Sequence, residues 1–204
     1  MNATTRRLGH SIIGLGLLAL VALALLAVVP RATHAATLVD APPCNGVPAT
    51  ITGSGTIHGT PGDDVIVGSR EDDTIDGGGG NDRICSFSGD DVINGGAGDD
   101  TILAGDGNDT VRGQAGDDNI HGDFGDGLDT FSGRNDDIID GGTGNDALDG
   151  DLGNDTIKGG DGNDFLGGDI QNIGPSGTDS LDGGKGIDEC FFGEVLKRCE
   201  TVFP

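Results

Sequence analysis

Gly95-Gly96-Ala97-Gly98-Asp99-Asp100-Thr101-Ile102-Leu103 is one copy of a nine-residue pattern, Gly-Gly-x-Gly-Asx-Asp-x-aliphatic-x. The stretch Gly159-Gly160-Asp161-Gly162-Asn163-Asp164-Phe165-Leu166-Gly167 is another copy. Seven copies run without a gap from residue 59 to residue 121, and three more run from residue 141 to residue 167. A short fixed period predicts a solenoid rather than a globule, because each unit can bury its apolar side chain only against its neighbours.

Position six of the pattern, counted from its first glycine, is the most regular. It is aspartate in all fourteen units that align, whereas position five varies among Asp, Asn, Leu, Thr and Ile. The fourteen aspartates are Asp64, Asp73, Asp82, Asp91, Asp100, Asp109, Asp118, Asp129, Asp137, Asp146, Asp155, Asp164, Asp179 and Asp188. A single such aspartate would be an ordinary turn former. The row as a whole indicates carboxylates that gather around a hard cation, and Ca²⁺ takes six to eight oxygen ligands, backbone carbonyls included.

Positions seven to nine, such as residues 101–103, predict a very short strand whose middle side chain points inward. Position eight is Ile, Val, Leu, Phe or Cys in every unit. The glycines allow the close approach and positive φ angles of a tight turn. Turn, strand, turn, strand makes one coil of eighteen residues, so the predicted fold class is all-β.

Three units differ in length. The unit that starts at Gly122 has two extra residues before Asp129, the unit from Gly133 is one residue short, and the unit from Gly168 has six extra residues before Asp179. Solenoids tolerate such insertions as surface loops, which is the interpretation we prefer to a bulge that binds a partner.

The pattern resembles the repeats-in-toxin (RTX) calcium-binding nonapeptide family over residues 59–189. The resemblance implies a parallel β-roll, a solenoid of two short-stranded parallel sheets, with several Ca²⁺ ions between turns two repeats apart. By that analogy Asp100 and Asp118 would share one ion, and Asp82/Asp100, Asp91/Asp109 and Asp146/Asp164 would be similar pairs. Backbone carbonyls would join the Asp100/Asp118 ion from both turns, namely those of Gly96, Gly98, Gly113 and Ala115.

The calcium hypothesis also predicts folding on binding. One inward aliphatic side chain per nine residues buries little apolar surface against the backbone entropy of ordering the chain, and the stacked carboxylates repel one another. We therefore expect the chain to be largely unstructured without calcium and to fold cooperatively with it.

The net charge and the N-terminal residues predict which partners and which cellular compartment the chain has. The 204 residues contain 35 acidic and 11 basic side chains, so we expect no nucleic acid as a partner. Residues 1–35 are typical of a cleaved signal peptide, with Arg6 and Arg7 before an apolar run and Thr33-His34-Ala35-Ala36 at its end. An uncleaved membrane anchor is the alternative. We expect a monomer that is secreted, at the cell surface or in the periplasm, with no membrane contact after cleavage.

The four cysteines of an exported chain predict two disulfides, for which three pairings are possible. Proximity favours Cys190–Cys199, which leaves Cys44–Cys85. Residues 36–58 and 190–204 flank the repeats of residues 59–189 as N-terminal and C-terminal caps, because an open solenoid must protect its edges.

No catalytic motif is found. The chain has no G-x-S-x-G elbow and no H-E-x-x-H sequence. His58 and His121 both fall at position nine, where side chains point outward, so we expect them to be surface residues. A stand-alone calcium-binding module is the leading hypothesis, without an enzymatic activity. An extracellular structural or adhesive protein that binds glycans is the second, and an enzyme acting on acidic polysaccharide is the third.

Overall fold

A computed structural model describes residues 43–123, 135–168, 177–192 and 195–203. Residues 1–35, Asp129 and the inserted segments around Phe124 and Gln171 lie outside the described residues. Within the described ranges the regular elements are all β-strands, numbered β1 to β17. No helix in these ranges is long and apolar enough to cross a membrane.

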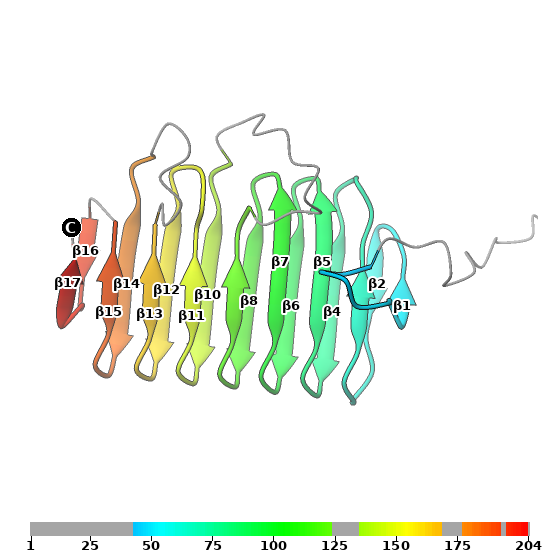
Figure 1. Cartoon of the computed structure of the whole chain (residues 1–204), viewed down its shortest axis with the longest axis horizontal. Helices are drawn as coiled ribbons and strands as arrows, with labels where there is room; N and C mark the ends of the chain where they lie inside the picture. Colours follow the sequence, from blue (N-terminus) through cyan, green and yellow to red (C-terminus); the bar gives the residue numbers. More distant parts are fainter. Residues whose placement is uncertain (1–42, 124–134, 169–176, 193–194, 204) are drawn as a thin grey trace, which may run out of the picture. The chain divides into compact units, whose positions relative to one another are not determined.

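Two parallel sheets face each other, and consecutive strands alternate between them (Figure 1). The nine-stranded sheet contains β1 (Ile51–Thr52), β3 (Val65–Val67), β5 (Arg83–Ser88), β7 (Thr101–Asp106), β9 (Asn119–His121), β11 (Ala147–Asp149), β13 (Phe165–Gly167), β15 (Glu189–Phe191) and β17 (Thr201–Phe203). The eight-stranded sheet contains β2 (Thr56–His58), β4 (Thr74–Gly79), β6 (Val92–Ala97), β8 (Thr110–Ala115), β10 (Ile138–Thr143), β12 (Thr156–Asp161), β14 (Ser180–Lys185) and β16 (Val195–Lys197). The parallel β-roll implied by the repeat is confirmed.

The register of the strands shows the coil length directly. Thr74 pairs with Val92 and Val92 with Thr110, so one coil takes 18 residues where the repeats are uninterrupted. Between β8 and β10 the separation grows to 28 residues, because Thr110 pairs with Ile138. Among the described strands β10 therefore lies directly beside β8, and the separate unit expected around Asp129 falls outside the described residues.

Position eight supplies the core between the two sheets. Its side chains form one continuous apolar cluster, and Ile66, Ile84 and Ile102 are completely buried. Because successive side chains of a strand point to opposite faces, a three-residue strand can place one side chain inside and two outside. The predicted inward direction of position eight is thereby confirmed for the described units.

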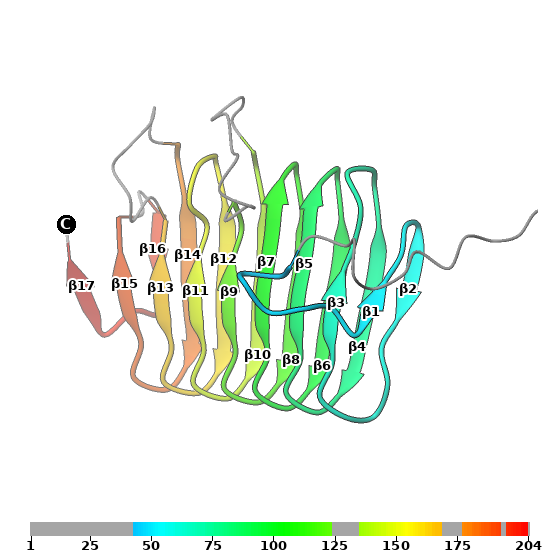
Figure 2. The ribbon, with the colours of Figure 1, turned by 45° about the vertical axis from the view of Figure 1, so that its right-hand side comes forward.

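The ends of the roll are closed by segments without the glycine pattern. At the start, residues around Cys44 and Ala49 cover Val67, Cys85 and Leu103 on the outer face of the nine-stranded sheet. Figure 2 shows this segment crossing the strands. Disulfides join Cys44 to Cys85 and Cys190 to Cys199, with S–S distances of 2.07 Å and 1.96 Å, as expected from the sequence. At the other end, Leu196 packs against the core, whereas Phe192 and Val195 stay exposed.

Candidate metal sites in the stacked turns

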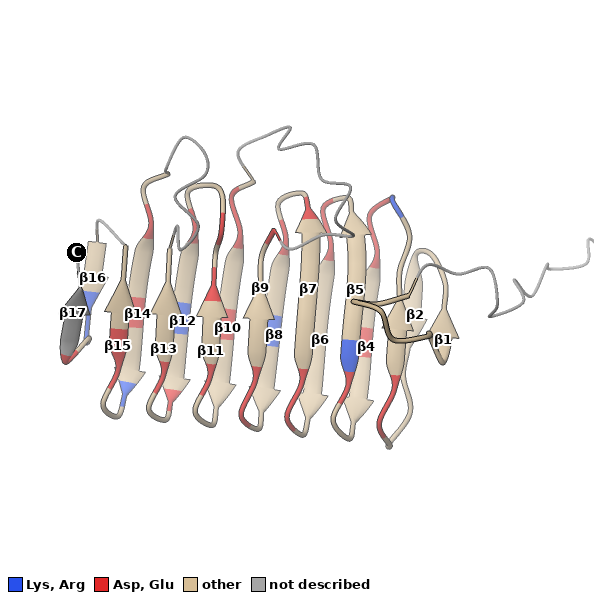
Figure 3. Ribbon diagram, viewed as in Figure 1, with Lys and Arg blue, Asp and Glu red and all other residues tan. Residues whose placement is uncertain are grey.

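The position-six aspartates form two stacks, one along each edge of the roll (Figure 3). The turns from the eight-stranded to the nine-stranded sheet, here called the lower turns, contain Asp64, Asp82, Asp100, Asp118, Asp146, Asp164 and Asp188. The turns in the other direction, the upper turns, contain Asp73, Asp91, Asp109, Asp137, Asp155 and Asp179. All thirteen are at most 7 % exposed. The predicted set is thus brought together, apart from Asp129, which lies outside the described residues.

One oxygen of each carboxylate joins a ladder along its stack. The Asp82 amide donates to Oδ1 of Asp100, and the Asp100 amide donates to Oδ1 of Asp118, both at 2.8 Å. The same bond spans the inserted segment, where the Asp109 amide donates to Oδ1 of Asp137. The ladder holds consecutive aspartates face to face, and it brings together the expected pairs Asp82/Asp100, Asp100/Asp118, Asp91/Asp109 and Asp146/Asp164.

The second oxygen is buried without a hydrogen-bond donor. Within the described part of the chain this holds for Oδ2 of Asp82, Asp91, Asp100, Asp109, Asp118, Asp137, Asp146, Asp164 and Asp188. A buried carboxylate oxygen without a partner is costly unless a cation or a proton compensates its charge. Such an oxygen recurs at position six of successive repeats, as a row of cation sites requires.

Glycine at position one leaves the space beside each such oxygen open. A Cβ atom on Gly95 would lie 2.3 Å from Oδ2 of Asp100 and 3.0 Å from the carbonyl oxygen of Gly113 in the next coil. A Cβ atom on Gly113 would likewise lie 2.1 Å from Oδ2 of Asp118. Carboxylate and carbonyl oxygens of adjacent coils therefore converge on the same small space. This donor set fits Ca²⁺, which takes oxygen ligands of both kinds.

The other predicted carbonyls are placed differently. The Ala115 carbonyl accepts a hydrogen bond from the Gly98 amide at 2.7 Å. The Gly98 carbonyl lies against Gly116 of the next coil, and Gly96 pairs in register with Gln114. Of the four predicted carbonyls, Gly113 is the one that the structure puts beside an unpaired Oδ2.

Burial raises the pKa of eight of these aspartates, and neighbouring carboxylates add to the effect, although the ladder amides oppose it. The eight are Asp82, Asp91, Asp100, Asp109, Asp118, Asp137, Asp146 and Asp164. The pKa reaches about 6 at Asp100 and about 7 at Asp118. The highest values are about 8 at Asp109 and about 9 at Asp137, because both carboxyls are deeply buried, and nearby carboxylates that include Asp123 add to the effect. Each stack therefore strongly favours the binding of positive charge.

The first two aspartates differ from the rest. Oδ2 of Asp64 accepts hydrogen bonds from the Thr60 amide and hydroxyl at 2.7 Å and 2.8 Å. Although burial opposes them, these bonds lower the pKa of Asp64. Oδ2 of Asp73 accepts from the Ser69 amide at 2.6 Å. Both carboxylates are satisfied by the protein itself, so the open row of oxygens starts at Asp82.

Position five forms a second ladder that the sequence analysis missed. The Asp117 amide donates to Oδ1 of Asp99, and the Asp99 amide donates to Oδ1 of Asn81. These side chains are exposed, and they also link the coils. The signal was the preference for Asp or Asn at position five, because a short side chain with an acceptor oxygen is what an adjacent amide needs.

The two histidines have different surroundings. The His58 side chain is 71 % exposed, as expected for the surface. The His121 side chain is only 31 % exposed and lies between Asp149 and Asp151, so the expectation of a plain surface residue was wrong for it.

Comparison with known proteins gives one match. The sequence profile described as RTX calcium-binding nonapeptide repeat (4 copies) matches residues 51–84, 58–93, 88–111, 94–129 and 131–166, which together are more than half of the chain. No curated protein and no solved structure matches the sequence.

Proposed function

Because this chain belongs to the RTX calcium-binding nonapeptide repeat family, we propose that it is an extracellular β-roll that folds when several Ca²⁺ ions bind between its stacked turns. The observation that carries the proposal is the row of buried Oδ2 atoms without donors, which belong to Asp82, Asp100, Asp118, Asp146, Asp164 and Asp188 in the lower turns and to Asp91, Asp109 and Asp137 in the upper turns.

Each ion would be held by the Oδ2 of one aspartate and by oxygens of the next coil. For Asp100 one such oxygen is the carbonyl of Gly113, which borders the same space at Gly95, and Asp118 contributes the carboxylate of that coil. Bound Ca²⁺ supplies positive charge to carboxylates that otherwise repel one another. Asp64 and Asp73 would hold the first turns without an ion, because Thr60 and Ser69 already donate to them.

Coupling of binding to folding follows from the composition of the roll. The core receives one apolar side chain per turn, such as Ile93 or Ile102, and the remaining contacts between coils are backbone bonds and the two side-chain ladders. Without the ion the raised pKa values oppose ionisation of the stack and therefore oppose the coil itself at neutral pH. The ion thus supplies the missing stabilisation.

Two disulfides favour an oxidising compartment, which agrees with the signal peptide expected for residues 1–35. In that setting calcium is the ligand and the role is non-catalytic. The roll would form after export, when the chain meets calcium outside the cytoplasm.

The test is a calcium titration of the purified, disulfide-bonded protein that starts in excess chelator. We expect the β-sheet signal in far-ultraviolet circular dichroism to rise cooperatively with Ca²⁺. Mg²⁺ at the same concentrations should have little effect, because it requires a smaller octahedral site and keeps its water. An undiminished β-sheet signal in chelator would refute folding on binding, and an absence of bound Ca²⁺ in native mass spectrometry would refute the calcium sites.

A further inference from the structure

The outer face of the nine-stranded sheet carries one row of position-nine side chains, which changes from apolar to polar along the sheet. In register along the sheet, Val67, Cys85 and Leu103 are followed by His121 and Asp149. The first three belong to the apolar cluster under the N-terminal segment. The row then continues with an imidazole and a carboxylate that the calcium-binding turns do not use.

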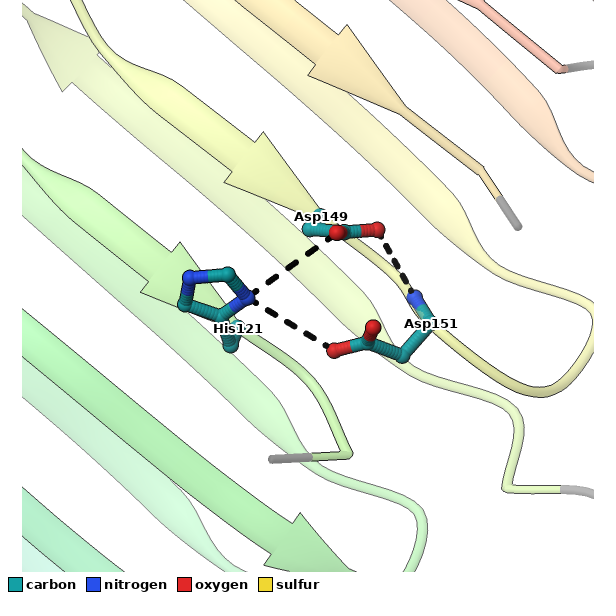
Figure 4. Close-up of side chains that lie close together, drawn as sticks. All are labelled: His121, Asp149 and Asp151. Carbon is teal, nitrogen blue, oxygen red and sulfur yellow. Dashed lines mark hydrogen bonds and ion pairs between the residues drawn. The ribbon is translucent and has the colours of Figure 1, made fainter. Parts of the chain in front are cut away.

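His121, Asp149 and Asp151 converge in one small cluster (Figure 4). His121 Nδ1 lies 3.9 Å from Asp149 Oδ2 and 3.7 Å from Asp151 Oδ2. Both distances are too long for hydrogen bonds. They are close to the separation of about 3.4 Å between two ligands that each lie about 2.1 Å from a tetrahedral Zn²⁺ ion.

Asp151 independently indicates a missing ligand. It is 6 % exposed, and neither of its carboxylate oxygens has a hydrogen-bond partner. Its φ angle of 62° is in the left-handed region, which a residue other than glycine rarely adopts. Its amide donates to Oδ1 of Asp149 at 3.2 Å, so the backbone bond that positions Asp151 also orients the second carboxylate. A carboxylate buried in this way is costly unless positive charge compensates it, either from a protonated His121 or from a bound cation.

We propose that His121, Asp149 and Asp151 form a Zn²⁺ site that is distinct from the calcium-binding turns. The imidazole sets its selectivity, because Ca²⁺ takes oxygen ligands whereas Zn²⁺ binds histidine nitrogen together with carboxylate oxygen. One nitrogen and two carboxylate oxygens leave the fourth tetrahedral position to water. The two carboxylates balance the double charge of the ion within a partly buried environment.

His58 offers a matched control. His58 Nδ1 also lies 3.9 Å from a carboxylate oxygen, Oδ2 of Asp76. That pair is exposed, at 71 % and 52 %, and no second carboxylate is described beside it. The two histidines therefore share position nine and a similar first partner, and they differ in burial and in the presence of an Asp151 equivalent.

The experiment is a Zn²⁺ titration by isothermal calorimetry with Ca²⁺ held at saturation, so that the turns are occupied. We expect the full-length protein and His58→Ala to bind one Zn²⁺ with equal affinity. His121→Ala and Asp151→Asn should bind it at least about tenfold more weakly, since each removes a ligand. Circular dichroism in calcium checks that each variant keeps the roll.

Nuclear magnetic resonance of the unmodified protein gives a readout that does not depend on the folding of a variant. Zn²⁺ should shift the imidazole signals of His121 and leave those of His58 unchanged. Equal zinc affinity in His121→Ala and the unmodified protein, or shifts confined to other histidines, would overturn the proposal. Failure of the unmodified protein to bind Zn²⁺ would also overturn it and would leave the calcium function untouched.

Discussion

At the scale of single residues, the aspartates at positions five and six of the same turn have different roles. Asp100 is buried and leaves one oxygen open, whereas Asp99 is exposed and accepts a hydrogen bond from the Asp117 amide. The rows of position five end at Thr178 and Ile187, whose amides donate to Asn154 and Asn163. At these two positions no side-chain acceptor is needed for a further coil, and the residue is not Asp or Asn.

Asp100→Asn tests the role of the open oxygen. The amide keeps an acceptor for the Asp82 amide but removes a charge from the ion, so the Ca²⁺ concentration at the midpoint of folding should rise by several-fold. Asp99→Asn is the matched control, because it keeps the acceptor for Asp117 and should leave that midpoint nearly unchanged. Circular dichroism during calcium titration measures both. Equal midpoints for the two variants would contradict the assignment of Asp100.

The raised pKa values of Asp109 and Asp137 predict that the stability of the metal-free fold falls as the pH rises, whereas the affinity for calcium increases with pH. A carboxyl whose pKa is higher in the folded state stabilises the fold at low pH, and this contribution is lost as pH rises through the folded value. For pKa values of about 8 and about 9, the loss extends from about pH 4 to about pH 9. The metal-free protein should therefore gain β structure on acidification.

Where acid has folded the metal-free protein, Ca²⁺ must displace these same protons, so its affinity should increase with pH as that form disappears, and binding should release protons. Calcium affinities measured at pH 6 and pH 8, in two buffers of different ionisation enthalpy, would check this. An affinity independent of pH would show that the aspartates are already ionised in the metal-free protein and that acid does not fold it.

At the scale of the strands and turns, the two outer faces of the roll are built differently. Along the eight-stranded sheet, position nine alternates in charge through Arg112, Asp140, Lys158 and Asp182, and Lys158 Nζ lies 2.9 Å from Asp140 Oδ1. Opposite charges on adjacent strands favour this register. The nine-stranded sheet instead carries an apolar row under the N-terminal segment. Neighbouring coils are matched on both faces, but by different interactions.

Gly95→Ala tests the close approach between coils at a lower turn. Its Cβ would fill the space between Asp100 Oδ2 and the Gly113 carbonyl, so we expect the free energy of unfolding in calcium to fall by about 2 kcal/mol or more. At Gly62 an added Cβ would have no atom within 4 Å, and Gly62→Ala should change the stability by no more than about 0.5 kcal/mol. Urea unfolding measures both variants, and similar stabilities would argue against a tight cradle at position one.

At the scale of the whole molecule, the roll is a stack that is held mainly by neighbouring coils and closed at both ends. Its C-terminal end continues the aspartate ladder with a different residue, since the Asp188 amide donates to Oε2 of Glu200 at 2.6 Å. The Cys190–Cys199 disulfide ties this last coil to the core, and the Cys44–Cys85 disulfide ties the N-terminal segment to β5. Both disulfides therefore protect ends at which a solenoid would fray.

Removal of the Cys44–Cys85 disulfide should cost stability through the unfolded state. The two cysteines are 41 residues apart, for which loop closure contributes about 4 kcal/mol. Cys44→Ala/Cys85→Ala should lose stability on this order in urea unfolding with saturating calcium, while its β-sheet signal persists. Cys44→Ala combined with alkylation of the free thiol should behave in the same way. A double variant as stable as the unmodified protein would show that the Cys44–Cys85 disulfide does not contribute to the free energy of unfolding.

Much of this architecture could be predicted from the sequence. The coil of eighteen residues, the inward position eight and the stacked aspartates follow from a period of nine, because local periodicity determines the phase and direction of each side chain. The same periodicity does not determine which coil lies next to which across an insertion. Only the tertiary structure decided that Ile138 pairs with Thr110, that Thr60 satisfies Asp64, and that His121 meets Asp149 and Asp151. Those contacts join residues of different coils, and their register depends on backbone pairing beyond the reach of the repeat.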